Sequence, residues 1–251
     1  MAQRKAFIIG NPISPYMRKV MAACALKDVE LEIDPIVPFL GDAEFSAISP
    51  LRRIPVYRDD LVTLCDSSVI CQYLEDRWPE PRLYPEDIVV RARARWLEEY
   101  GDTRVGDVFV WKIFNAAVIA PAVFGAPRDK AQRERVLSEE LPEVMNYLES
   151  QMPESGFLCG KLSIADISIA PYFANIQFAR VEPDWTRWPK TQRWLSKVLA
   201  ETALGKLHEI AAQIVRKPVP EHREAVAALG IKVSAQTVGE GTPVRGPLTP
   251  A

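Results

Sequence analysis

The stretch Phe7-Ile8-Ile9-Gly10-Asn11-Pro12-Ile13-Ser14-Pro15-Tyr16-Met17-Arg18 decides the fold of this 251-residue chain. Its first three residues have the composition of a short buried strand, and apolar residues recur at helical spacing from Pro15 to Lys27. Serine directly before a proline at the first helical position is a frequent N-cap arrangement. The stretch therefore predicts a strand that is followed by a helix, with the Ser14 hydroxyl at the helix N-terminus.

Two further segments extend this pattern: Arg52-Arg53-Ile54-Pro55-Val56 and Asp66-Ser67-Ser68-Val69-Ile70. Residues 31–33 alternate like a second strand, and residues 56–58 and 61–64 flank a turn-prone Asp-Asp pair, as the strands of a hairpin do. A helix is expected over residues 66–77. The order βαβ, a helical connection and ββα is that of a thioredoxin-like domain.

Everything after the prolines at 79 and 81 has helical patterning up to about residue 215. A long helix is expected from Ile88 to about Ala120, where Pro121 should end or kink it, and Pro142 implies a kink in the next helix. Ser163 to Asp166 fits a capping box and is interpreted as a folding element without a catalytic role. The predicted parts are residues 1–79 (thioredoxin-like), 80–87 (linker), 88–215 (all-helical) and 216–251 (a tail containing proline and glycine, expected to pack on the helical domain or on a partner subunit).

The composition limits the classes of function. A hydrophobic content of 48% and a net charge of -2 indicate a soluble globular protein without a broad basic field for nucleic acid or anionic lipid. The four cysteines form no C-x-x-C pair and there are two histidines, so no metal site is expected. The N-terminus has too few consecutive apolar residues for a signal sequence or a membrane span, which favours a cytoplasmic location with reduced thiols.

Four motifs carry a family resemblance: Ser14-Pro15-Tyr16, Arg53-Ile54-Pro55-Val56, Asp66-Ser67, and the segment from Gly160 to Asp166. In this order and spacing the chain resembles the cytosolic glutathione S-transferases over residues 5–215, and the serine-type classes, tau and its bacterial relatives, look closest. The resemblance implies the family's fold, a thioredoxin-like domain followed by an all-helical one. It also implies a homodimeric, cytoplasmic detoxification enzyme that uses glutathione as co-substrate and attacks a hydrophobic electrophile.

The motifs suggest a role for each residue. Ser14 would donate a hydrogen bond to the glutathione thiolate, which the helix N-terminus also favours. By resemblance, Ile54-Pro55 is a cis turn whose open backbone edge pairs with the cysteinyl unit of glutathione. Asp66 and Ser67 would hold the ammonium and the carboxylate of the γ-glutamyl end. Arg53, with Arg52 in reserve, would meet the glycyl carboxylate, for which the stretch around Leu40 offers no lysine.

Some roles stay open at the level of sequence. Arg18 either adds positive charge near the sulfur or is a solvated arginine, and Asn11 is an alternative donor to the thiolate. The electrophile would lie between the loop containing Ile13 and the inner face of the long helix, where Trp111 and Asn115 stand at helical spacing with Val108 and Lys112. Such residues are more often part of a core. Asp102 and Asp107 either reach a neighbouring subunit's glutathione or are solvated acids.

The reaction also stays open. A glutathione-dependent isomerase, dehalogenase or ether-cleaving lyase would share the thiolate and differ only in the pocket. A non-catalytic transferase-like binding or assembly module would typically lack part of the set Ser14, Pro55, Asp66 and Ser67, which is complete here. A thiol-disulfide oxidoreductase needs a cysteine at the helix start, and the nearest cysteine, Cys24, lies well inside the predicted helix.

Overall fold

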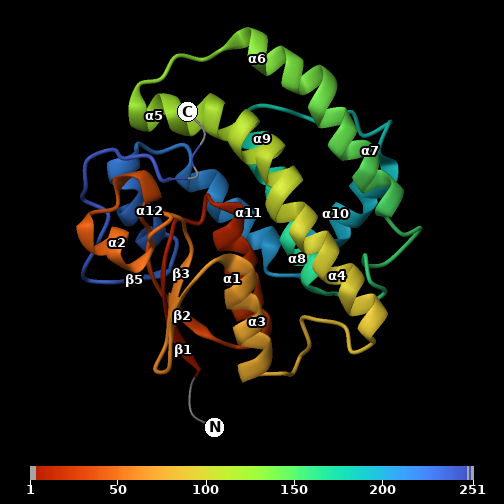
Figure 1. The fold of residues 1–251 in the computed structure, drawn as a ribbon, viewed down its shortest axis with the longest axis horizontal. Coiled ribbons are helices and arrows are strands. Elements are labelled where there is room, and N and C mark those ends of the chain that lie inside the picture. Colours follow the sequence, from red (N-terminus) through yellow and green to blue (C-terminus); the bar gives the residue numbers. More distant parts are fainter. Residues whose placement is uncertain (1–3, 248, 250–251) are drawn as a thin grey trace. The chain divides into compact units, whose positions relative to one another are not determined.

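The computed structural model describes residues 4–247 and 249. The chain divides into two compact units: one comprises the described residues of Met1–Pro81 and Leu207–Ala251, and the other comprises Arg82–Lys206 (Figure 1). This division differs from the predicted parts at the C-terminal end, because everything from Leu207 onward belongs with the N-terminal residues. We refer to the two as the N-terminal unit and the helical unit.

The N-terminal unit is built on a mixed sheet with strand order β4-β3-β1-β2-β5. β1 and β2 are parallel, and β3 is antiparallel to both β1 and β4. The side chains of Ile8, Ile33 and Tyr57 are completely buried, so apolar residues of three strands form the centre of the unit. The elements up to residue 81 are β1 (Lys5–Ile9), α1 (Pro15–Leu26), β2 (Glu30–Asp34), η1 (Pro38–Leu40), α2 (Ala43–Ile48), β3 (Val56–Arg58), β4 (Thr63–Cys65) and α3 (Ser67–Arg77). This is the thioredoxin-like order that the sequence predicts.

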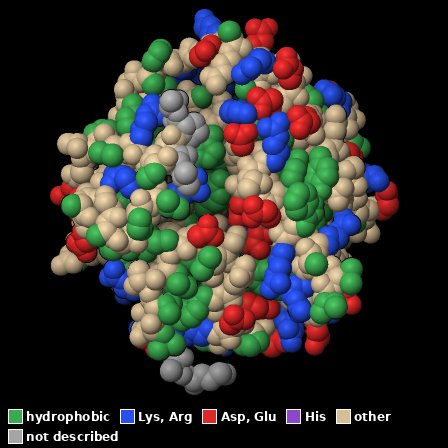
Figure 2. Space-filling view, in the orientation of Figure 1, with side chains coloured by type: hydrophobic (Ala, Val, Ile, Leu, Met, Phe, Trp, Pro, Cys, Tyr) green, Lys and Arg blue, Asp and Glu red, His purple; other side chains and the backbone are tan. Residues whose placement is uncertain are grey.

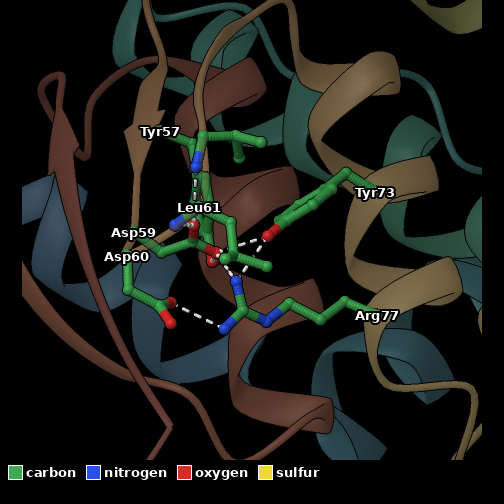
Figure 3. Close-up of polar contacts among 7 residues, drawn as sticks. Tyr57, Asp59, Asp60, Leu61, Tyr73 and Arg77 are labelled. Atoms are coloured by element: carbon green, nitrogen blue, oxygen red, sulfur yellow. Dashed lines mark hydrogen bonds and ion pairs between the residues drawn. The ribbon is translucent and has the colours of Figure 1, made fainter.

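The β3–β4 hairpin is joined to α3 by the carboxylate of Asp59 (Figure 3). Its Oδ2 accepts hydrogen bonds from Tyr57 Oη at 2.9 Å, Tyr73 Oη at 2.8 Å and Arg77 Nη1 at 2.7 Å. Its Oδ1 accepts from two backbone N–H groups of the turn. Burial opposes the ionisation of Asp59, but these hydrogen bonds outweigh it and lower the pKa of the carboxyl group. The ionised side chain of Asp59 therefore links the hairpin to the helix through several hydrogen bonds.

The C-terminal segment completes this unit. It contains α11 (Leu204–Ile214) from Leu207 onward, η4 (Val219–Glu221), α12 (His222–Ala228) and β5 (Lys232–Val233). β5 pairs in parallel with β2, so the tail extends the sheet at its open edge (Figure 1). Arg223 binds the Asp34 carboxylate at 2.6 Å, and further along Val244 N–H donates to Phe39 O at 2.8 Å.

The sequence predicts packing of this tail on the helical domain or on a partner subunit; instead, the described residues of the tail belong to the N-terminal unit. The tail packs on the sheet of its own N-terminal unit because the β2 edge offers unpaired backbone groups and Asp34 offers a buried carboxylate.

The helical unit contains one long continuous helix and several shorter ones. The long helix is made of α4 (Ile88–Tyr100), η2 (Gly101–Ile119) and α5 (Ala120–Phe124). The others are α6 (Lys130–Arg135), η3 (Val136–Glu140), α7 (Leu141–Gln151), α8 (Ile164–Ile169), α9 (Pro171–Phe178) and α10 (Pro189–Glu201).

Pro121 and Pro142, for which an end or a kink of the helix is predicted, both lie within continuous helical stretches. Pro121 does not end the long helix, which continues to Phe124 and stops at Gly125 with φ of 64°. Both Pro121 and Pro142 lie in the first turn of an α-helical stretch that follows a wider, π-helical one, η2 or η3. Because proline has no N–H to donate, each of the two interrupts the ladder of helical hydrogen bonds at the junction of the π-helical and α-helical stretches.

The long helix Ile88–Phe124 is apolar and long enough to cross a membrane by length and composition alone. The core helix of a soluble protein passes the same test. Val105, Val108 and Phe109 of η2 are completely buried within the helical unit, which accounts for part of its apolar character.

The capping box at α8 is confirmed. Asp166 is completely buried and accepts hydrogen bonds from Ser163 N–H at 3.0 Å, Leu158 N–H at 2.9 Å and Trp194 Nε1 at 2.8 Å. Burial raises its pKa, against the effect of these hydrogen bonds. All of its contacts are structural.

Candidate active site

The register of the sheet brings three of the predicted motifs to one edge. Ile9 pairs with Val56, and Val56 pairs with Cys65, so these three residues form one row across the strands. At this edge each strand is flanked by one residue outside the sheet, which follows β1 and β4 but precedes β3. The residues at these positions are Gly10, Pro55 and Asp66. Segments that are about ten to fifty residues apart in sequence therefore emerge side by side, which spacing alone does not reveal.

Ser14 lies at the N-terminus of α1, as predicted. It is the N-cap residue, with φ of -70° and ψ of 130°, and its hydroxyl accepts from Met17 N–H at 3.4 Å. This is a long, weak contact. Because the hydroxyl oxygen is the acceptor, the hydroxyl proton remains available for a second partner. Capping and donation to a ligand are therefore compatible in this geometry.

Arg18 is not a solvated arginine. Its side chain is completely buried, and Nη1 donates to the carbonyl oxygens of Pro12 and Ile13, each at 2.8 Å. Burial and the charge of Arg18 together lower the pKa of His208 in α11 to about 2, so this histidine is neutral at physiological pH. The guanidinium thus binds two carbonyl groups of the loop that precedes Ser14 and adds a buried positive charge to it.

Asn11 is occupied as a donor. Its Oδ1 accepts from Ile13 N–H at 3.1 Å, and its Nδ2 lies 3.2 Å from both Pro35 O and His222 Nδ1. Because these contacts use both amide hydrogens, Asn11 cannot also donate to a thiolate without losing one of them. The alternative in which Asn11 is the thiolate's donor is therefore not supported.

The Ile54–Pro55 peptide bond is cis, as the resemblance implied. Gly10 packs directly against this turn: a Cβ added at Gly10 would lie 3.3 Å from Ile54 Cβ and 3.0 Å from Met17 Sδ. With φ of 154°, Gly10 also has a backbone conformation that other residues rarely adopt. Glycine at this position lets the end of β1 approach the turn closely.

Asp66 and Ser67 lie at the N-terminus of α3. Asp66 is the N-cap residue, and its Oδ1 accepts from Ser68 N–H at 2.9 Å and Val69 N–H at 3.2 Å. Its φ of 77° is unusual for a residue with a side chain, and such strained residues cluster at ligand sites. Ser67 is 4% exposed.

Sequence reasoning missed Lys19. Its side chain is 1% exposed, and its ammonium group donates to Ser68 Oγ at 2.8 Å, which adds a buried cation to the start of α3. The only sequence signal is a basic pair, Arg18-Lys19, inside an otherwise apolar helix.

The two arginines before the cis turn have different surroundings. Arg53 has an exposed side chain, while its backbone N–H and C=O are bound by the Ser49 hydroxyl at 3.1 and 2.9 Å. Arg52 instead binds Gly41 O at 2.8 Å and the hydroxyl of Ser46. Arg52 therefore supports the segment around α2, and Arg53 is the better candidate for an anionic ligand.

The residues proposed to contact the electrophile fall in different units. Ile13 is buried in the N-terminal unit, whereas Trp111 is partly buried and Asn115 is 8% exposed in the helical unit. Within the helical unit Lys112 binds Asp107 at 2.8 Å and Glu140 at 2.7 Å, so its charge is already compensated. In the same unit, Asp102 accepts from Tyr172 Oη at 3.0 Å.

Two thiols of the N-terminal unit, Cys24 and Cys65, lie in surroundings that favour the protonated form. Cys24 is completely buried, and burial raises its pKa; burial also raises the pKa of Cys65. Ser14 stands where an oxidoreductase of this fold would need its cysteine. Among residues 4–247 and 249 no group of His, Cys, Asp and Glu side chains could hold a metal ion.

Comparison with known proteins agrees with this geometry. The family model described as "Glutathione S-transferase, N-terminal domain" matches residues 8–82. The model described as "Glutathione S-transferase, C-terminal domain" matches residues 130–196. A glutathione S-transferase of Hyoscyamus muticus is 26% identical over 207 residues, which are 80% of this chain and 96% of the relative. A maleylacetoacetate isomerase of Mus musculus is 26% identical over 190 residues, 72% of this chain and 82% of the relative.

Solved structures show the same fold. A glutathione S-transferase from Rhodospirillum rubrum F11 has a TM-score of 0.71 at 22% identity, covering 97% of this chain and 96% of that one. The apo form of human glutathione-S-transferase T1-1 has a TM-score of 0.73 at 21% identity, and the match covers 90% of this chain and 99% of that one. Since the two family models together match more than half of the sequence, the chain belongs to the glutathione S-transferase family of enzymes, whose co-substrate is glutathione.

Proposed function

We propose that this protein is a serine-type glutathione transferase in which the Ser14 hydroxyl stabilises the glutathione thiolate for attack on a hydrophobic electrophile. The observation that carries the proposal is the position of Ser14. It caps α1 weakly, its proton can serve a second acceptor, and its loop emerges beside the cis turn and the N-terminus of α3. Attack of the sulfur on the electrophile forms a C–S bond and gives a thioether, and the electrophile's leaving group, or a proton taken up, balances the step.

The remaining groups suit an extended tripeptide with charged ends. The backbone of Ile54, next to the cis proline, would pair with the cysteinyl unit. Asp66 would bind the γ-glutamyl ammonium, and Ser67, at the N-terminus of α3, would bind its carboxylate. Arg53 would meet the glycyl carboxylate. The buried ammonium of Lys19, at the start of α3, adds positive potential where the γ-glutamyl carboxylate would bind.

The size of the thiolate effect can be bounded. A model thiol with a pKa of about 8.5 is roughly 3% ionised at pH 7. A fall of about two pKa units raises that fraction to about three-quarters, a gain of roughly 25-fold. The Ser14 hydrogen bond, the α1 N-terminus and the Arg18 charge all favour the ionised sulfur.

The test is the ultraviolet absorption band of the thiolate on adding glutathione. Ser14→Ala should abolish the band and lower kcat/KM for a general electrophile. Ser14→Gly is the matched control for the helix cap, since glycine caps almost as well as serine but has no hydroxyl. Both variants should lose the band, while Ser14→Thr, which keeps a hydroxyl, should retain it. A normal band in Ser14→Gly with glutathione bound would refute the role of the hydroxyl.

An isomerase is the second candidate because a relative named maleylacetoacetate isomerase matches 72% of this chain. An isomerase that uses the same thiolate returns glutathione unchanged, whereas a transferase consumes one glutathione for each product. Measuring glutathione consumption over a panel of electrophiles and unsaturated acids separates these two and also detects a dehalogenase or an ether lyase. A non-catalytic module would show no thiolate band.

We further propose that the protein is a cytoplasmic homodimer that acts in detoxification and that Ile13, Trp111 and Asn115 contact the electrophile. Lys, Arg, Asp and Glu side chains are interspersed on the face shown in Figure 2, which agrees with the net charge of -2 and with small-molecule substrates. Light scattering tests the dimer. Trp111→Ala should change the preference among electrophiles without changing glutathione binding.

A further inference from the structure

His222 in the C-terminal segment contacts the loop that precedes Ser14. Its Nδ1 lies 3.2 Å from Asn11 Nδ2, across a separation of 211 residues in the chain. Both residues are buried, with 4% and 3% of their surface exposed. No motif in the sequence links the two positions, and the region matched by the family models ends at residue 196, before His222.

The hydrogen bonds define the state of this histidine. His222 Nε2 lies 3.1 Å from Lys217 O. Because a carbonyl oxygen only accepts, Nε2 carries the proton and Nδ1 is the acceptor for the Asn11 amide. Burial lowers the pKa of His222, against the Lys217 bond and the nearby charge of Glu221, which keeps the ring neutral at physiological pH.

Asn11 transmits this contact to the catalytic turn. With Nδ2 held by His222 and Pro35, its Oδ1 is directed to Ile13 N–H at 3.1 Å. Its backbone carbonyl accepts from Ser14 N–H at 2.9 Å. If the acceptor at residue 222 were lost, a buried N–H would be unsatisfied, and rotation of the amide to relieve it would break the bond to Ile13.

We propose that His222 is a positioning residue for the Ser14 hydroxyl, acting through Asn11 on the turn that carries it. The inference rests on the function proposed above. It gives the C-terminal segment a role in catalysis, because α12 supplies an acceptor that the thioredoxin-like elements do not contain. A shift of a few tenths of an ångström in this turn would weaken the hydrogen bond from Ser14 to sulfur.

The experiment compares two substitutions of the same residue. His222→Phe keeps an aromatic ring without an acceptor, while His222→Asn places an amide oxygen near the position of Nδ1. Glu224→Gln, an exposed neighbour on α12, is the surface control. Arg223→Gln removes the ion pair with Asp34 and so loosens the docking of the tail without touching Asn11. Circular dichroism confirms folding, and the pKa of bound glutathione is read from the thiolate band.

His222→Phe should raise the pKa of bound glutathione by about half a unit, a roughly threefold loss of thiolate at pH values below the pKa. The KM for glutathione should change little, because Arg53, Asp66 and Ser67 are untouched. His222→Asn should restore most of the thiolate, and Arg223→Gln should leave the thiol pKa unchanged. If His222→Phe does not fold, His222→Leu, which also removes the acceptor, takes its place: a positioning role predicts a raised thiol pKa in His222→Leu and a normal one in His222→Asn, and a normal thiol pKa in both overturns the inference.

An unchanged pKa in folded His222→Phe, or a raised pKa in Arg223→Gln equal to that in His222→Phe, overturns the inference. If the wild-type band disappears in Ser14→Ala, such a result leaves the proposed function intact. If the wild-type protein forms no Ser14-dependent thiolate, the proposed function itself fails.

Discussion

Replacing Asp59 by asparagine should destabilise the N-terminal unit far more than the same change at its neighbour, Asp60. Both carboxylates bind Arg77, at 2.7 and 2.6 Å, but the Asp59 side chain is completely buried and that of Asp60 is 71% exposed (Figure 3). The two substitutions thus test how much burial changes the contribution to stability of an ion pair with the same guanidinium.

The expected magnitude follows from the acceptors. Asp59 Oδ1 accepts two backbone N–H groups, and Oδ2 accepts all three side-chain donors. An asparagine amide has one acceptor oxygen, so its NH2 group must face one of these two sets of donors whichever way it turns. Breaking a buried pair costs about 3–5 kcal/mol, whereas an exposed ion pair is worth about 0–1 kcal/mol. We expect these two values for Asp59→Asn and Asp60→Asn.

Urea denaturation followed by circular dichroism and tryptophan fluorescence measures both changes. The pH dependence of the free energy of unfolding gives a second test. Since folding lowers the pKa of Asp59, its contribution is fully present above the unfolded pKa of about 3.9 and is lost as the pH falls through the lower folded value. The difference between the wild type and Asp59→Asn should therefore persist from pH 7 to about pH 4 and shrink only in stronger acid. Equal losses below about 1 kcal/mol for both variants would refute the reasoning.

Two other predictions concern the sheet edge and the tail. Gly10→Ala should lower the free energy of unfolding by about 3 kcal/mol, from backbone strain and from contact with Met17 and Ile54, whereas Gly125→Ala, with φ of 64° and open space around it, should cost only about 1 kcal/mol. Thermal melting compares them, and similar losses would contradict the steric argument. Ending the chain at Arg216 should lower the melting temperature and cause aggregation, because it removes β5 and exposes the β2 edge. Unchanged melting and light scattering would show that the tail is dispensable.

The features that the sequence predicted well depend on neighbours a few residues away. Ser14, Asp66 and Ser163 lie at helix N-termini because serine and aspartate side chains satisfy N–H groups two or three residues further on. The strand and helix order of the first 77 residues likewise follows from local periodicity. The cis bond at Pro55 and the family itself came from motif resemblance rather than from any local physical signal.

The tertiary structure decided what depends on distant residues. The sequence leaves Arg18 open between solvent and the site, and only the carbonyl groups of the folded loop explain why a guanidinium is completely buried. The two-residue strand β5 has too little pattern to predict, and it exists because β2 presents an open edge. The contact between Asn11 and His222 joins positions 211 residues apart. Such pairings carry no local signal, since their free energy arises only when packing removes both partners from water.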